Sequence, residues 1–233
     1  MRFDRLLQSQ GFGSRKECQA LISAGRVQVN GLVRTDSDEE LDGSSLLITI
    51  GGESWPYREH LYLALNKPTH LECSHGPTHH KSVFSLLPAH FVARGIQCVG
   101  RLDAETTGLL FLSDDGAFVH AMTSPKRHVP KTYAVTACEE LTSAQLDALN
   151  APIVLRDEKE PAHGSAIRTG TRTLELTIDE GRYHQVKRML SAVGNRVEHL
   201  HRVRIGDCTL PTGLAPGRWL ELDPATLSLR IKT

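Results

Sequence analysis

Several absences in the sequence narrow the classes of protein to which it can belong. The 27 Lys and Arg residues balance the 27 Asp and Glu residues, so no global field attracts nucleic acid. No apolar run approaches the roughly 20 residues of a membrane span, and the charged, glycine-interrupted first residues do not resemble a signal peptide. A P-loop and a GxGxxG motif are also missing, which argues against nucleotide-dependent chemistry. We therefore expect a soluble, cytoplasmic protein.

Paired cysteines are missing as well. The five cysteines are odd in number and widely spaced, with no CxxC, which favours a reducing compartment over a disulfide scaffold or a zinc ribbon. The stretch CSHGPTHH offers Cys73, His75, His79 and His80 as metal ligands, but their spacing fits no standard zinc pattern. We therefore expect a flexible polar loop there and no metal site.

The chain does contain enough apolar material for a core. Its 233 residues, 39% of them hydrophobic, suit one large domain or a small domain with a medium one. The apolar spacing of residues 3–7 predicts a short helix, and Ser14 with Glu17 predicts a capping box that starts a second one. Asn30-Gly31 is a strong hairpin signal. The chain therefore begins with two helices and a hairpin.

Composition also suggests where domains divide. Residues 51–59 are rich in glycine and charge and predict a linker between a domain of residues 1–50 and one of residues 60–233. In the second domain, strand-like and helical patterns mix without strict alternation, including a short helix expected at 82–87. This mixture predicts an α+β fold with a largely antiparallel sheet.

Positive charge gathers in three places. Residues 1–34 hold six Lys and Arg against two acids, residues 116–131 hold no acid, and residues 182–204 hold six Lys and Arg against one acid. One such run is ordinarily a solvated face, but three in a neutral chain favour a polyanion. Tyr133 follows the middle run and belongs either to the core or to a stacking surface for a base. The candidate RNA contacts are Arg15, Lys16, Arg26, Arg182 and Arg188.

The stretch GRLDAETTG places Asp103 between two strand-like runs. Asp103 is either a loop residue that caps a turn or a nucleophile or base at a strand end. A lone carboxylate differs from a two-carboxylate glycosidase, although Glu105 and Asp114 are near. Arg101 or Lys187 beside Asp103 would favour its ionised form. Lys187 lies near the start of its helix, where an anionic partner would offset the unfavourable dipole, or it points into water.

Four stretches together resemble a known family. GRLDAETTGLLFLSDDG, with LNKP at 65–68, KTY at 131–133 and EGRYHQVKRML at 180–190, is similar in content and order to the motifs of the RsuA-type ribosomal RNA pseudouridine synthases. The first 50 or so residues resemble the S4-like RNA-binding domain of that family. The motifs are closer to the small-subunit (16S) branch. A 23S synthase and a non-catalytic rRNA-binding assembly factor remain as alternatives.

The resemblance implies a role for individual residues. Asp103 would be the catalytic aspartate and Lys187 its partner, where many relatives have arginine. Tyr133 would stack on the target base, Arg101 would guard the gap left by the flipped uridine, and Thr107 would contact the substrate. The implied reaction turns one uridine of 16S RNA, of the uridine-516 type, into pseudouridine. The implied enzyme is a monomer that needs no cofactor, acts on 16S RNA or a small-subunit assembly intermediate, and has no membrane partner.

Overall fold

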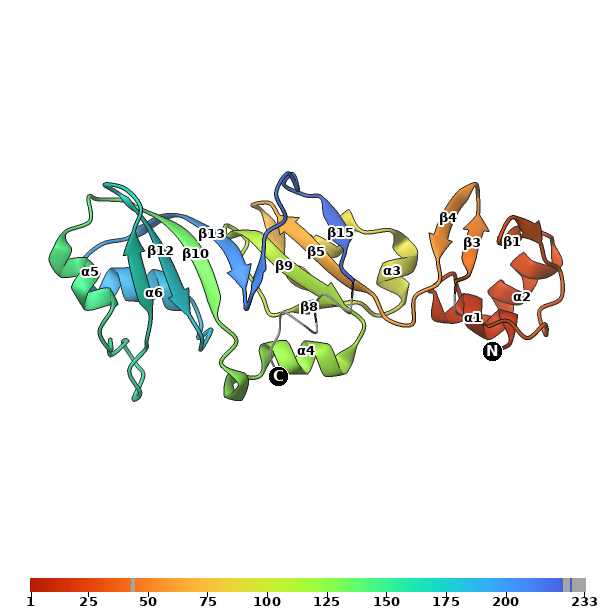
Figure 1. Ribbon diagram of the computed structural model, residues 1–233, viewed down its shortest axis with the longest axis horizontal. Helices are drawn as coiled ribbons and strands as arrows, with labels where there is room; N and C mark the ends of the chain where they lie inside the picture. The colour runs from red at the N-terminus through yellow and green to blue at the C-terminus, as the bar shows by residue number, and fades with distance from the viewer. Residues whose placement is uncertain (43–44, 224–226, 228–233) are drawn as a thin grey trace. The chain divides into compact units, whose positions relative to one another are not determined.

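The structure, a computed structural model, describes residues 1–42, 45–223 and 227 and divides into two compact units. One unit comprises residues 1–61 and 87–97, and the other begins at residue 62 and resumes at residue 98 (Figure 1). The end of the predicted 60–233 domain, residues 224–226 and 228–233, lies outside the described residues.

The first unit packs two short helices against a small sheet. The helices are α1 (Phe3–Ser9) and α2 (Arg15–Ser23), and the strands are β1 (Val27–Val29), β2 (Leu32–Val33), β3 (Leu47–Ile50) and β4 (Glu53–Pro56). The strand order is β2-β1-β3-β4, and every neighbouring pair is antiparallel. The predicted capping box of α2 and the Asn30-Gly31 hairpin are both confirmed.

The predicted linker at residues 51–59 is partly a strand. β4 pairs with β3 across a turn at Gly51 and Gly52, both with positive φ, a conformation that glycine adopts without steric cost. The glycines that suggested a linker therefore form a tight turn within the first unit, which extends to residue 61.

A later segment of the chain completes the first unit. Residues 87–97, with α3 (Ala89–Ala93), belong to it although they follow part of the second unit in sequence. The ring of His90 lies 4.6 Å from that of Phe12 and 4.5 Å from that of Trp55, centroid to centroid. Arg94 donates to Gln10 Oε1 at 2.9 Å. The N-terminal unit is therefore not one continuous stretch of chain.

His90 makes the stability of this unit depend on pH. Burial lowers the pKa of its imidazole from 6.5 to about 4. Between these values the unfolded chain binds a proton that the folded unit rejects, so stability falls as pH drops from about 6.5 to 4. We expect a loss of about 2 kcal/mol, less than the full shift would give because the ring is only half-buried.

Urea unfolding at pH 7 and pH 4, followed by tryptophan fluorescence, measures this loss. The variant His90→Phe keeps an aromatic ring without a titrating nitrogen and should lose this part of the pH dependence. An equal drop in both proteins would show that another group is responsible.

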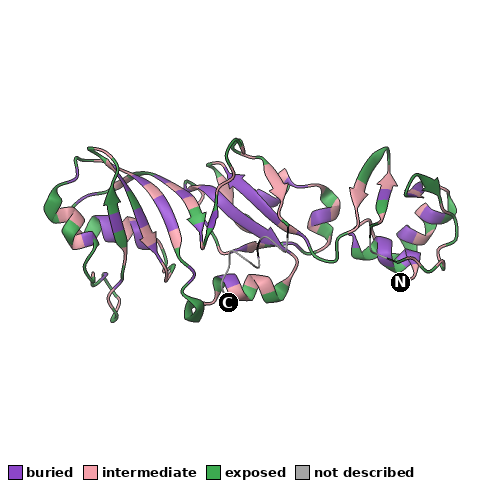
Figure 2. Cartoon of the chain, viewed as in Figure 1, coloured by how far each residue is buried: buried purple, intermediate pink, exposed green. Residues whose placement is uncertain are grey.

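The second unit is built on a nine-stranded sheet with the central order β11-β12-β10-β13-β9-β5-β15. Its strands are β5 (Tyr62–Lys67), β8 (Gln97–Val99), β9 (Thr107–Ser113), β10 (Lys131–Ala137), β11 (Ser165–Arg168), β12 (Thr173–Ile178), β13 (Val197–Ile205), β14 (Cys208–Thr209) and β15 (Trp219–Glu221). β13 and β9 run parallel, whereas the other pairs along the central order for which a register is assigned are antiparallel. The largely antiparallel α+β fold is confirmed, and Figure 2 shows the buried central strands.

Short helices surround this sheet. They are α4 (Gly116–Thr123), α5 (Ser143–Leu149) and α6 (Gln185–Ala192), with the 3-10 turns η1 (Val83–Leu86) and η2 (Pro125–Arg127). A parallel pair of two-residue strands, β6 (Leu71–Glu72) and β7 (Lys81–Ser82), lies apart from it. Among the described helices, none is long and apolar enough to cross a bilayer.

Two local predictions differ from the structure. The helix expected at 82–87 is a single 3-10 turn, since Pro88 disfavours helical backbone at the residue before it. The basic run at 182–204 contains β13, which pairs with β10. Within β13, Arg202 is 3% exposed and donates its Nε hydrogen to the Leu109 carbonyl at 2.7 Å. That arginine is therefore part of the sheet and not of a solvated face.

Candidate active site

The loop that joins β8 to β9 carries Asp103 to the wall of a cavity of about 760 Å³ within the second unit. Gly108, the second residue of β9, has φ +102°, and a Cβ atom there would lie 2.3 Å from the Arg202 carbonyl oxygen. Only glycine therefore allows β9 to start so close to β13. The residues that line the cavity include Arg101, Asp103, Tyr133, His184, Lys187 and Arg202.

Two side chains contact the Asp103 carboxylate, one at each oxygen. Lys187 Nζ lies 2.7 Å from Oδ2, and His184 Nε2 lies 3.1 Å from Oδ1. All three side chains are about one-third exposed, so solvent and ligands can reach them. The carboxylate lies where α6 begins, and its negative charge interacts favourably with the positive end of the helix dipole. It also offsets the unfavourable interaction of that dipole with Lys187 in the first turn.

In the sequence, His184 is one residue of the basic run at 182–204 and carries no other signal. It occupies the N-cap position of α6 with φ +50°, a left-handed conformation uncommon for residues other than glycine. Its ring stacks on Tyr183, with centroids 3.8 Å apart, and Tyr183 is 76% exposed. The strained position turns the imidazole toward Asp103 and leaves an aromatic surface at the cavity. No signal in the sequence marks this contact.

Lys67 holds the Asp103 loop in place through backbone carbonyls of the loop. This fully buried lysine donates from Nζ to the carbonyls of Asp103 at 3.0 Å, Ala104 at 2.9 Å and Thr106 at 2.9 Å, and to that of Pro68 at 3.0 Å. Burial lowers the pKa of the Lys67 ammonium. The sequence signal for this contact is a lysine inside an apolar strand, and no role for Lys67 was predicted from it.

Lys67→Met should destabilise the protein by about 3 kcal/mol, because it removes a buried cation and leaves carbonyls without a donor. The measurement is the urea midpoint of the full-length variant. Lys159→Met, at an exposed position, serves as the matched control and should change stability by less than about 0.5 kcal/mol. A Lys67→Met protein as stable as this control would mean that the loop does not depend on the ammonium.

Tyr133 and two further cations complete the cavity wall. Tyr133 lies in β10 opposite Arg202 of β13, and its side chain is buried to 8% exposure. Lys131, two residues earlier, is half-buried in the same wall, and burial lowers the pKa of its ammonium. A buried aromatic ring among cations suits a flat, polar ring attached to a phosphate.

Three other predicted contacts in the second unit already have protein partners. Arg182 and Arg188 both form ion pairs with Glu158, which lower the pKa of that carboxyl. Thr107 Oγ1 lies 2.7 Å from His201 Nδ1. Arg182 still lines the cavity, but its guanidinium is engaged with the backbone of residues 160 and 161 as well. The charges of Arg182 and Arg188 are thus paired within the protein, and of the three side chains Arg182 is the one that lines the cavity.

The predicted RNA contacts in the first unit differ in whether they already have a protein partner. Arg15 donates to Asp4, a fully buried carboxylate, at 2.8 Å. This bond is the main cause that lowers the pKa of Asp4. Lys16 and Arg26 are exposed. The charge of Arg15 is thus shared with the fold, while those of Lys16 and Arg26 face solvent.

Two family models match the chain in succession. The S4 domain matches residues 1–47, and the RNA pseudouridylate synthase family matches residues 61–192. The second match takes in Lys67, Asp103, Tyr133 and Lys187.

Full-length relatives carry consistent names. The chain is 38% identical to "Ribosomal small subunit pseudouridine synthase A" of Escherichia coli (95% of this chain, 96% of the relative) and of Vibrio parahaemolyticus (93% and 94%). It is also 38% identical to "Uncharacterized RNA pseudouridine synthase YtzG" of Bacillus subtilis, over 98% of both chains. A crystal structure of a pseudouridylate synthase superposes with a TM-score of 0.70 at 33% identity, over 99% of both chains.

Proposed function

Because this chain belongs to the RNA pseudouridylate synthase family and is an RNA pseudouridine synthase with an N-terminal S4 domain, we propose that it isomerises one uridine of 16S ribosomal RNA. Asp103 is the reacting carboxylate in this proposal. The observation that supports it most is the contact of Asp103 with Lys187 in a cavity lined by an aromatic side chain. The ion pair orients the carboxylate toward the cavity.

The reaction exchanges one bond at the ribose for another. The N1–C1′ bond of uridine breaks, the base rotates, and C5 bonds to C1′, while the proton lost from C5 is replaced by one on N1. Asp103 either attacks C1′ or removes the 2′ proton to give a glycal, and both routes need an ionised carboxylate within reach of the ribose. No electron is gained or lost, so the isomerisation itself requires no redox group.

The target uridine must leave its stack to reach the cavity, at a cost of roughly a few kcal/mol. Tyr133 offers a ring for the extruded base and is placed to take the C5 proton. Arg101 is exposed at the start of the same loop and can occupy the space that the base vacates. Lys131 lies in the cavity wall where the phosphate of the extruded nucleotide would need a cation.

The exposed cations of the S4 domain should contribute phosphate contacts. Replacing Lys16 and Arg26 together with glutamine should reduce the slope of log K against log[salt] by about 1.4 to 1.8, since each phosphate contact contributes about 0.7 to 0.9. The measurement is binding of a 16S RNA fragment between 50 and 200 mM salt, a range over which such contacts change affinity strongly. The paired variant Lys159→Gln with Arg168→Gln, both exposed in the second unit, is the control. Equal slopes in the two would remove the S4 cations from the RNA interface.

The choice of 16S RNA is supported by relatives that are named small-subunit enzymes, and a site of the uridine-516 type is part of the proposal. Mapping pseudouridines in rRNA from cells with and without the gene tests it. One pseudouridine should disappear from 16S RNA and none from 23S RNA. A missing 23S site would instead favour the large-subunit alternative.

We further propose that the enzyme acts as a monomer, in the cytoplasm where ribosomal RNA matures, on 16S RNA or a small-subunit assembly intermediate.

A further inference from the structure

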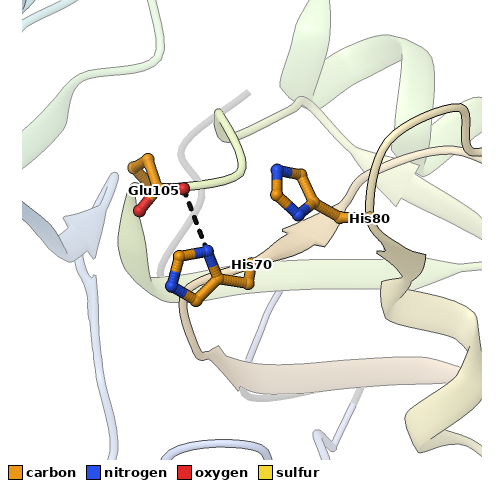
Figure 3. A group of neighbouring side chains, drawn as sticks. All are labelled: His70, His80 and Glu105. Carbon is orange, nitrogen blue, oxygen red and sulfur yellow. Dashed lines mark ion pairs between the residues drawn. The ribbon is translucent and has the colours of Figure 1, made fainter.

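We propose that His70, His80 and Glu105 form a site for one Zn²⁺ ion. One ligand atom from each residue can be chosen so that all three lie within 4.8 Å of one another. Figure 3 shows the three side chains turned toward a shared space. Among the described residues, this is the group of His, Cys, Asp and Glu side chains that meets this spacing. None of the three is among the described residues that line the Asp103 cavity.

The donor set suits zinc. Two imidazoles and a carboxylate are a common three-ligand set for zinc, with water in the fourth position. At metal–ligand distances of about 2.0–2.2 Å, neighbouring ligand atoms of a tetrahedral site lie about 3.4 Å apart. His70 Nδ1 and Glu105 Oε1 are 3.1 Å apart. The widest pair, at no more than 4.8 Å, must therefore approach by at most about 1.4 Å.

The backbone already fixes the segments that carry the ligands. His70 has φ +59°, and its N–H donates to the Ala104 carbonyl at 2.9 Å, beside Glu105. The N–H of His80 donates at 2.8 Å to Glu72, which also accepts the two preceding N–H groups. These three bonds lower the pKa of the Glu72 carboxyl to about 2. Only side-chain rotation is left for binding, and the His70 and Glu105 side chains are 68% and 60% exposed.

This arrangement revises the expectation for CSHGPTHH. Its backbone is held by Glu72 and is not the free polar loop expected from the sequence. His75 stacks on Phe84, with centroids 3.8 Å apart, and does not belong to the group. His80 alone from this stretch joins the group, and the other two ligands come from outside it. The ligand spacing along the chain therefore matches no standard zinc pattern, although the ligand positions suit the ion.

A bound ion would brace the Asp103 loop. It would connect the segment after β5, the segment before β7 and the loop between β8 and β9, through Glu105 two residues from Asp103. Lys67 binds the same loop through the backbone carbonyls of Asp103 and Thr106. Such an ion would stabilise the loop, and its presence does not depend on which RNA the enzyme modifies.

Titration of the chelator-treated, full-length protein with Zn²⁺, followed by calorimetry, tests the site. Wild type should bind one equivalent that His70→Asn, His80→Ala and Glu105→Gln each bind at least tenfold more weakly. Asparagine is chosen at position 70 because it tolerates positive φ. His120→Ala, at an exposed histidine of α4 outside the group, should bind like wild type.

Co²⁺ in place of Zn²⁺ gives a spectroscopic readout that separates this site from the free cysteines. The proposed ligands should give a tetrahedral absorption spectrum without the charge-transfer band of a thiolate ligand. Zn²⁺ should also raise the melting temperature of wild type but not that of Glu105→Gln. Equal Zn²⁺ affinity in all four variants and wild type, or a cobalt spectrum dominated by thiolate ligation, would overturn the proposal.

Discussion

Asp103→Asn is expected to abolish pseudouridine formation while the Kd for RNA stays within about threefold of wild type. Asparagine keeps the shape of the side chain and still accepts a hydrogen bond from Lys187. It is neither a nucleophile nor a base of useful strength, so the step at the ribose fails. Phosphate and stacking contacts supply the affinity and do not involve this carboxylate.

Single-turnover conversion of a 16S RNA fragment and filter binding of the same RNA measure the two effects separately. Asp207→Asn, in the exposed turn after β13, changes an equivalent side chain away from the cavity and should be fully active. Turnover by Asp103→Asn near the wild-type rate would remove the carboxylate from the reaction. Loss of RNA binding in parallel with activity would instead assign it to binding or folding.

Lys187→Met is expected to lower the single-turnover rate by two orders of magnitude or more, as removal of a preorganised charge at a reacting group does. Methionine keeps most of the length of the side chain but removes the ammonium, so that His184 is left as the ion-pairing partner of Asp103 in the cavity. The stability of the protein should not fall to the same extent, because a cation in the first turn of α6 opposes the helix dipole. A large rate loss with a small stability loss is the signature of this role.

Lys187→Arg separates the charge from the shape of the side chain. Arginine keeps the positive charge, but its planar guanidinium is larger and places its donors differently. We expect partial activity, above that of Lys187→Met and below wild type, in single-turnover assays across pH. If Lys187 served only as a solvated helix residue, both variants would react at the wild-type rate and differ from it by less than about 0.5 kcal/mol in stability. A fully active Lys187→Met protein would remove α6 from the reaction.

Sequence alone determined the elements that depend on a few neighbouring residues. The Ser14–Glu17 capping box and the Asn30-Gly31 hairpin are formed as predicted. Their hydrogen bonds close within four residues, so the local residue types decide them. The family was also accessible, since its motifs are contiguous stretches, and with it came the choice of Asp103, Tyr133 and Lys187.

The resemblance also implied the pairing of Lys187 with Asp103, 84 residues apart, and that contact is confirmed. Only the tertiary structure decided the other contacts of the site, such as that of His184, which reaches the same carboxylate from a left-handed backbone position. The basic run at 182–204 predicted a charged face, whereas Arg202 lies buried in the sheet between β9 and β10. Residues 87–97 complete the first unit through rings that no local pattern connects to them. Such contacts depend on which strands and segments pair across the fold, and composition and spacing do not encode that pairing locally.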